Sequence, residues 1–253
     1  MLPAYYYWKP HFIVKAVFRY RVLWAVLTVV LGFWEPLERL GGRHPASTWL
    51  MLSGWLAQSG VLPMQQASEM VTSLAILLAV AAAALRTWGT AYLSSGVMLD
   101  GALHGERMVA DGPYRYMRNP LYLGSLLNTL ALVILMPPGG AVFVLAVTVV
   151  RYAMSVHAEE AHLLQTQGDA YRAYQSQVSR WLPSLRAKVA EGGARARWGQ
   201  AFVAEMYVWG MAATYAALAW RYNTMLLFQG VLVSFGLSLV VRAFLPKPPT
   251  SAQ

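Results

Sequence analysis

Two stretches of the chain carry side chains that could do chemistry together. The first, Asp111 to Gly124, holds two arginines, three tyrosines, two prolines and two glycines. The second begins at His157 and contains two adjacent carboxylates, Glu159 and Glu160. Arg115 and Arg118 of the first stretch, facing these carboxylates, would form a site for a ligand that carries both an ammonium and a carboxylate group. The same charges could equally form a salt-bridge network that ties two loops together, and spacing alone leaves both interpretations open.

The first stretch is too polar and too stiff for a lipid-facing helix. Gly112-Pro113 favours a turn, and Pro120 suits the first turn of a following helix. We therefore predict a structured loop at the membrane surface that leads directly into a transmembrane helix.

Other kinds of site find little support. His157 and His162 are five residues apart, whereas zinc sites on one helix use histidines at i and i+4, so we predict no metal site. There is no Gly-x-Ser-x-Gly, Gly-x-Gly-x-x-Gly or phosphate-loop motif, and the absence of cysteine excludes thiol catalysis. The net charge of +9 fits basic loops at a membrane surface. We do not predict nucleic-acid binding, because the sequence has no basic run interleaved with aromatic residues.

The composition indicates what must position these residues. Hydrophobic residues make up 57% of the 253 and charged residues 12%, about half the share of a soluble domain. We predict an all-α, polytopic transmembrane helical bundle of six or seven membrane segments, whose cytoplasmic loops form a pocket for a ligand. The predicted segments cover about 22–34, 47–62, 70–93, 121–136, 141–154, 205–220 and 224–245.

Positive charge predicts the orientation. Arginine and lysine concentrate in blocks 94–119 and 155–204, whereas turns 63–68 and 137–140 contain neither. The positive-inside rule places both basic blocks, and the site with them, on the cytoplasmic side of a multi-pass membrane protein. The basic N-terminal cluster conflicts with this if segment 22–34 spans fully, so that segment is either a tilted span or a partial, re-entrant helix.

Two arginines lie near the ends of predicted spans. Arg86 is interpreted as reaching toward the interface, whereas Arg151, shortly before the glutamate pair, is as good a functional candidate as an interfacial residue. Ser125, Asn128 and Thr129 form a polar stripe that is typical of hydrogen bonding between helices.

The opening stretch resembles the integral-membrane methyltransferases of the isoprenylcysteine carboxyl methyltransferase and phospholipid methyltransferase type. Their pattern, Gly-Pro-Tyr followed by Arg-His-Pro-x-Tyr-x-Gly, corresponds here to residues 112–114 and 118–124, with Asn119 at the position of the His. Their second element, Glu-Glu followed by Leu, Gly and two Tyr, corresponds to Glu159-Glu160, Leu163, Gly168, Tyr171 and Tyr174. The resemblance covers about 86–183, which suggests a methyltransferase-like core between N-terminal segments in 1–85 and a basic linker with two further spans in 184–253.

The resemblance implies S-adenosylmethionine as cofactor and a lipophilic small molecule or lipid as acceptor, with the oligomeric state left unknown. Carried over by position, the cofactor-binding residues are Arg107, Met108, Val109, Tyr114, Arg118, Asn119, Pro120, Leu121, Tyr122, Glu159 and Glu160. Arg151 and Glu160 are the predicted catalytic residues, with Arg151 orienting an acceptor that is most naturally a carboxylate.

The chain departs from the family at two positions. Asn119 stands where the family usually has His, and Glu106 stands where carboxyl methyltransferases tend to have another His, with His104 two residues upstream. Two alternatives therefore stay open. One is a membrane reductase of the sterol-reductase type, which ends in a similar motif and uses a nicotinamide cofactor; the other is a non-catalytic scaffold or transporter subunit.

Overall fold

The computed structural model describes residues 21–34, 46–93 and 110–244, and all regular structure in these ranges is helical. The first half contains α2 (Arg21–Trp34), α4 (Thr48–Gln58), α5 (Met64–Tyr92) and the short helix η1 (Gly112–Arg115). The second half contains α7 (Pro120–Val133), α8 (Pro138–Gln177), α9 (Trp198–Ala204), α10 (Met206–Leu218), η2 (Ala219–Arg221) and α11 (Thr224–Phe244). The predicted all-α fold is thus confirmed for the described residues.

Within the described ranges, three helices are long and apolar enough to cross a membrane: α5, α8, and Thr224–Val241 of α11. The apolar helices α2 and α7 have 14 residues each and would cover about 21 Å of a hydrocarbon core roughly 30 Å thick. These apolar helices indicate a helical membrane protein. Among the described helices, three of the predicted membrane segments have the length of a full span.

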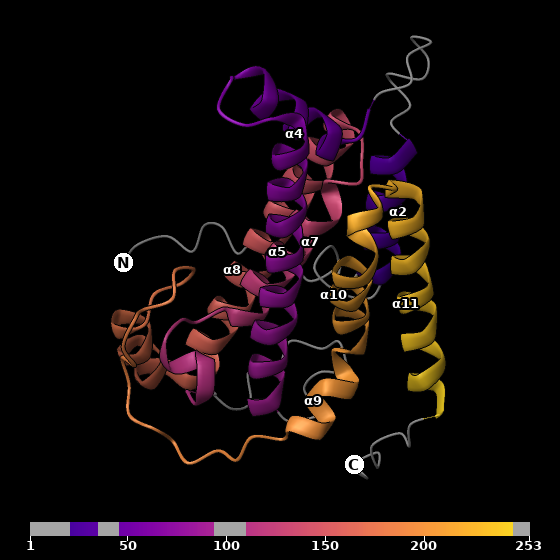
Figure 1. Cartoon of the computed structure of the whole chain (residues 1–253). Helices are drawn as coiled ribbons and strands as arrows, with labels where there is room; N and C mark the ends of the chain where they lie inside the picture. Colours follow the sequence, from indigo (N-terminus) through magenta and orange to yellow (C-terminus); the bar gives the residue numbers. More distant parts are fainter. Residues whose placement is uncertain (1–20, 35–45, 94–109, 245–253) are drawn as a thin grey trace, which may run out of the picture.

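Helix α5 is the centre of the bundle because small residues line its buried face. Ala75, Ala79, Ala82 and Ala83 are at most 2% exposed, and helices α4, α7 and α10 pack around α5 (Figure 1). Small side chains let helix backbones approach closely, which favours helix association in lipid. The start of α4 is fixed to the turn between α7 and α8, since Thr48 and Trp49 donate backbone hydrogen bonds to the carbonyls of Met136 and Ile134.

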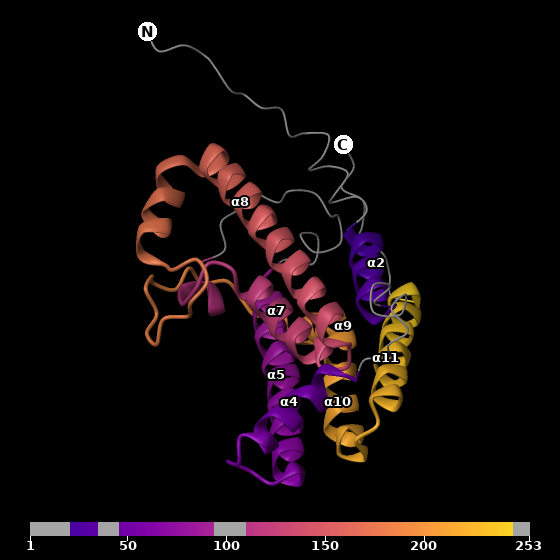
Figure 2. The ribbon, with the colours of Figure 1, turned by 90° about the horizontal axis from the view of Figure 1, so that it is seen from above.

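Helix α8 connects the bundle to the predicted glutamate pair. It begins after Pro137, at the tight turn that the sequence predicts, and its long first part carries Glu159 and Glu160 (Figure 2). Gly168 has a φ of +53°, a left-handed conformation that glycine adopts readily, and the chain bends there. This bend turns Tyr171 and Tyr174 back toward the loop around η1.

The crossing of α2 and α8 depends on two glycines. A Cβ atom on Gly140 would overlap the backbone carbonyl of Gly32, whereas a Cβ on Gly54 of α4 would meet nothing within 4 Å. We expect Gly140→Ala to destabilise the protein by about 1–3 kcal/mol, because the two backbones must move apart. Gly54→Ala, the matched control, is expected to be neutral or slightly stabilising. Thermal unfolding in detergent measures both, and equal midpoints would contradict the close crossing.

Candidate functional site

The loop that follows α5 has a fixed backbone. Gly112 has a φ of +56°, and a Cβ atom there would overlap the ring of Tyr92. Glycine is therefore required at this position for both conformation and space. From this turn, η1 leads through Arg118 and Asn119 to Pro120, the first residue of α7, as the sequence predicts.

Residues 178–197, which connect α8 to α9 and are here called the linker, lie along this loop. Arg118 N–H donates to the Ser179 carbonyl (2.9 Å), Ser184 N–H to Tyr116 (3.0 Å) and Lys188 N–H to Arg115 (2.9 Å). The buried carboxylate of Asp111 accepts hydrogen bonds from the backbone N–H of Gly192 and of Ala194. Residues 179–194 therefore hold the loop in place over its whole length.

Glu160 is the centre of a buried charged cluster. It is 4% exposed and forms ion pairs with Arg118 (3.1 Å) and Arg180 (2.7 Å). The amide nitrogen of Asn119 donates to Glu160 Oε1 (3.4 Å) and to the Arg180 carbonyl (3.2 Å), and Gln175 donates to Glu160 Oε2 (3.3 Å). The two predicted stretches thus meet in space, and Asn119 acts as a hydrogen-bond donor between them.

Arg115 is not part of this cluster. Its guanidinium donates to the Val189 carbonyl (3.1 Å) and lies 3.9 Å from the exposed carboxylate of Glu191. The expectation that Arg115 and Arg118 both face the glutamate pair is thus correct for Arg118 alone. The second arginine that forms an ion pair with Glu160 is Arg180, which was not predicted from the sequence. It reaches Glu160 because the linker folds back over the loop.

Glu159, the residue before Glu160 on α8, has a different partner. Tyr122 OH of α7 donates to Glu159 Oε1 at 2.6 Å. The Tyr122 ring packs edge-on against Tyr152, with 5.3 Å between centroids, and the guanidinium of Arg151 lies 4.7 Å from the Tyr152 centroid. A continuous series of contacts therefore runs from Arg151 to Glu159.

Three further residues that were predicted to bind the cofactor, Tyr114, Pro120 and Leu121, lie in the loop or at the start of α7. Tyr114 is buried, its carbonyl accepts a hydrogen bond from Tyr174 OH (2.8 Å), and burial raises the pKa of its phenol well above the ordinary value. Pro120 is buried at the start of α7, and the carbonyl of Leu121 accepts a hydrogen bond from Arg86. Arg107, Met108 and Val109, like His104 and Glu106, lie outside the described residues.

A second buried ion pair was missed by the sequence analysis. Arg86 donates from Nε and Nη2 to the two oxygens of Glu205 (2.6 and 3.0 Å), and Thr90 donates to the same carboxylate (2.8 Å). Arg86 also contacts Ser125 Oγ, and Gly124 leaves room for its side chain, since a Cβ there would lie 2.6 Å from Arg86 Cγ. Arg86 thus points into the bundle, and the interpretation that it reaches toward the interface was wrong. A lone acidic residue at the start of an apolar segment was the available signal for Glu205.

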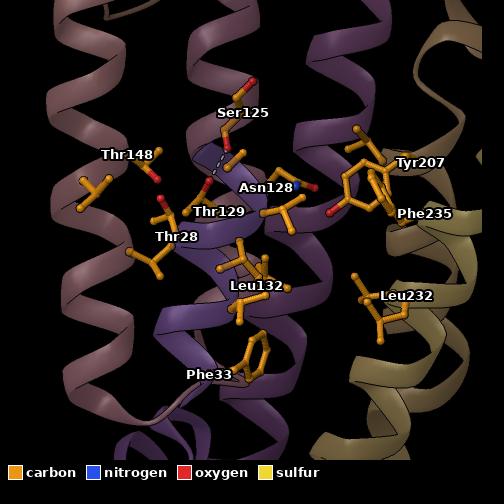
Figure 3. A pocket seen from close by; sticks show the side chains of 18 of the residues that line it. Thr28, Phe33, Ser125, Asn128, Thr129, Leu132, Thr148, Tyr207, Leu232 and Phe235 are labelled. Carbon is orange, nitrogen blue, oxygen red and sulfur yellow. Dashed lines mark hydrogen bonds between the residues drawn. The ribbon is translucent and has the colours of Figure 1, made fainter. Parts of the chain in front are cut away.

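This ion pair stands at the polar end of a large pocket, here called the inner pocket. Its volume is about 720 Å³, and its walls come from α2, α5, α7, α8, α10 and α11. In Figure 3, Thr28, Ser125, Thr129 and Thr148 gather toward one end, whereas Phe33, Leu132 and Leu232 line the other. Arg151 and Tyr152 also line the inner pocket, so it lies next to the series of contacts that leads to Glu159.

No other kind of centre emerges from the described residues. In those ranges no group of three or more His, Asp or Glu side chains could hold a metal ion. The charged cluster and the inner pocket together form a site with a zwitterionic region beside an apolar one. Such a site can hold a charged small molecule next to a lipophilic one.

Comparison with known proteins agrees with the arrangement. Residues 70–170 match the family model described as phospholipid methyltransferase. No curated protein and no solved structure matches the chain. The match runs from within α5, through the loop and α7, to just after Gly168 of α8, whereas α2, α4 and α9 to α11 lie outside it. The resemblance to integral-membrane methyltransferases is thereby confirmed over these residues.

Proposed function

We propose, from the phospholipid methyltransferase pattern of residues 70–170 and the charged cluster that they help to build, that this membrane protein transfers a methyl group from S-adenosylmethionine to a lipophilic acceptor. The observation that carries the proposal is Glu160, buried between Arg118 and Arg180. A buried carboxylate is retained at a cost in desolvation, so a binding role accounts for it better than stability does.

The charges of the cluster fit the amino-acid end of this cofactor, which carries one ammonium and one carboxylate. Glu159 and Glu160 supply negative charge, and Arg118 and Arg180 supply positive charge. Nε of Arg118 is buried without a hydrogen-bond acceptor among the described residues, and the carboxylate of a ligand would satisfy it. We therefore propose that Arg118 and Glu160 hold the two charges, with Tyr114, Asn119, Pro120, Leu121, Tyr122 and Glu159 forming the surrounding wall and Arg107 to Val109 adjoining them.

Catalysis in such a site requires mainly proximity and exclusion of water. When bound, the cofactor supplies a methyl group on a positively charged sulfur, which is already electrophilic. The protein then has to hold the acceptor in line with that methyl group and keep water away. Glu160 fixes the charged end of the cluster, and Arg151, at the boundary between the cluster and the inner pocket, orients the acceptor.

We also propose a topology for this function. Helices α7 and α10 pack against α5, which is long enough to cross the membrane, so with α2 and α4 the bundle contains six or seven membrane segments. The cluster would then lie on the cytoplasmic side, where the positive-inside rule places the basic linker. Within this scheme residues 86–183 remain the proposed methyltransferase-like core.

A cofactor titration tests the proposal directly. Purified protein is incubated in parallel with labelled S-adenosylmethionine and with a reduced nicotinamide cofactor, and membranes are then extracted for labelled lipid. We expect saturable binding of S-adenosylmethionine and label in the lipid extract. Binding of the nicotinamide cofactor alone would favour a reductase and overturn the proposal, and binding of neither would favour a non-catalytic role.

A further inference from the structure

We infer that the inner pocket binds one single-chain amphiphile with an anionic head group, and that Arg151 is the residue that selects the charge of that head group. The inference deepens the proposed function, because it names the acceptor of the same site. Binding of the amphiphile, however, is a property of the pocket alone and can be measured without any methyl transfer.

The charge of the polar end supports an anionic head group. Among the described residues, the charged side chains that line the inner pocket are Arg86, Glu205 and Arg151. Arg86 and Glu205 neutralise each other through two hydrogen bonds. Arg151 forms no ion pair within the described ranges and contacts the face of Tyr152, a ring that holds a cation without cancelling its charge. One positive charge therefore remains, and it favours an anion and disfavours an ammonium group.

The position of Arg151 places this head group next to the charged cluster. Arg151 lies against Tyr152, Tyr152 packs on Tyr122, and Tyr122 donates to Glu159. A head group held by Arg151 therefore sits on the side of the inner pocket that adjoins the proposed cofactor-binding residues. The hydroxyls of Ser125 and Thr129 do not compete for it as donors, since both donate to carbonyls of their own helix.

The size of the inner pocket supports one chain. A methylene group is close in size to a water molecule, which takes up about 30 Å³ of the liquid. A chain of sixteen such groups would occupy about 480 Å³ on this measure. The inner pocket has about 720 Å³, which is enough for one such chain.

The apolar walls that set this size lie mostly outside the segment that matches the methyltransferase family. Phe33 of α2 and Phe228 of α11 meet at 4.4 Å between ring centroids, and Leu232 and Phe235 continue the α11 wall. The Arg86–Glu205 ion pair joins the matched segment to the rest of the chain, because Arg86 lies inside that segment and Glu205 lies outside it. Helices α2, α10 and α11 thus adapt a methyltransferase core to a particular acceptor.

With a carboxylate head group the reaction balances without a base. Transfer forms one bond from the methyl carbon to a carboxylate oxygen and breaks one carbon–sulfur bond, whose electron pair stays on sulfur. The product is a neutral methyl ester, and no proton has to be removed. The ester has lost the negative charge that Arg151 attracts, so the product is held less tightly than the substrate.

Equilibrium binding of four probes tests the inference in protein purified in detergent, without cofactor. The probes are oleate, its methyl ester, oleylamine and dioleoyl phosphatidic acid, each competing with a fluorescent fatty acid. We expect oleate to bind at least tenfold more tightly than the other three. Arg151→Met should remove most of the preference for oleate over its ester, and Arg151→Lys, which keeps the charge, should retain part of it. Equal affinities for oleate and oleylamine would overturn the role of Arg151.

A pair of tryptophan substitutions tests whether the inner pocket is the binding site. Leu232 lines it, whereas Leu239, seven residues further along α11, does not, and their exposures of 51% and 50% are matched. Leu232→Trp should abolish oleate binding and Leu239→Trp should leave it unchanged. Unchanged binding in both variants, or tight binding of the diacyl lipid, would refute the single-chain pocket. If oleate binds as expected but no methyl ester forms, the proposed function fails while the pocket assignment stands.

Discussion

Replacing Glu160 by glutamine is expected to abolish binding of S-adenosylmethionine and to destabilise the protein by about 3–5 kcal/mol, because Arg118, whose side chain is 10% exposed, would lose its ion-pair partner in a buried place. At about 1.4 kcal/mol per factor of ten, even 3 kcal/mol lost from the bound state would weaken binding by more than 100-fold. The measurement is a titration with labelled cofactor, combined with thermal unfolding to establish that the variant is folded at the temperature used.

Two further variants separate binding from folding. Glu159→Gln removes a carboxylate that accepts from Tyr122 but leaves the ion pairs of Glu160 intact, so we expect a folded protein with weakened cofactor binding. Asp169→Asn is the control, since its carboxylate lies on the same helix with a side chain 94% exposed, and it should change neither property. A folded Glu160→Gln variant that binds the cofactor as the unaltered protein does would show that the cluster is structural only.

Replacing Glu205 by alanine is expected to lower the free energy of unfolding by about 3–5 kcal/mol, since the guanidinium of Arg86 would lose its ion-pair partner inside the bundle. Arg86 would keep only its contacts with Ser125 and the Leu121 carbonyl. Denaturation in mixed detergent, followed by circular dichroism, measures the loss. Glu191→Ala removes the 64% exposed partner of another arginine and should change stability by less than about 1 kcal/mol.

A double variant identifies the cause. Arg86→Met combined with Glu205→Leu removes both charges and fills much of the same volume, and replacing a buried ion pair in this way is often neutral. We expect this double variant to be more stable than Glu205→Ala alone. If it is as unstable as the single variant, the loss comes from packing at the junction of α9 and α10 and not from an unpaired charge.

The sequence predicted the helices and the loop well because these depend on local interactions. Hydropathy identified the apolar helices, and proline and glycine marked their ends, at Pro120, Pro138 and Gly168. The motif around Gly112-Pro113-Tyr114 and the Glu159-Glu160 pair predicted the two stretches that meet in the charged cluster, and the short turn between α7 and α8 brings them together. Asn119, the departure from the family, could be interpreted only from the structure, where its amide joins Glu160 to the linker.

The partners of the buried charges could not be predicted in this way. A helix forms its own backbone hydrogen bonds between residues four apart, so its position can be read from a short window of sequence. The partner of a buried side chain depends instead on which faces of distant helices meet. Arg86 and Glu205 are 119 residues apart, and Arg180 reaches Glu160 only because the linker folds back over the loop. By itself the sequence determined the fold class, the motif and the family resemblance. Only the tertiary structure decided that Arg86 is neutralised and that Arg151 has no ion-pair partner in the described part of the chain, because charge pairing in a membrane bundle follows from helix packing.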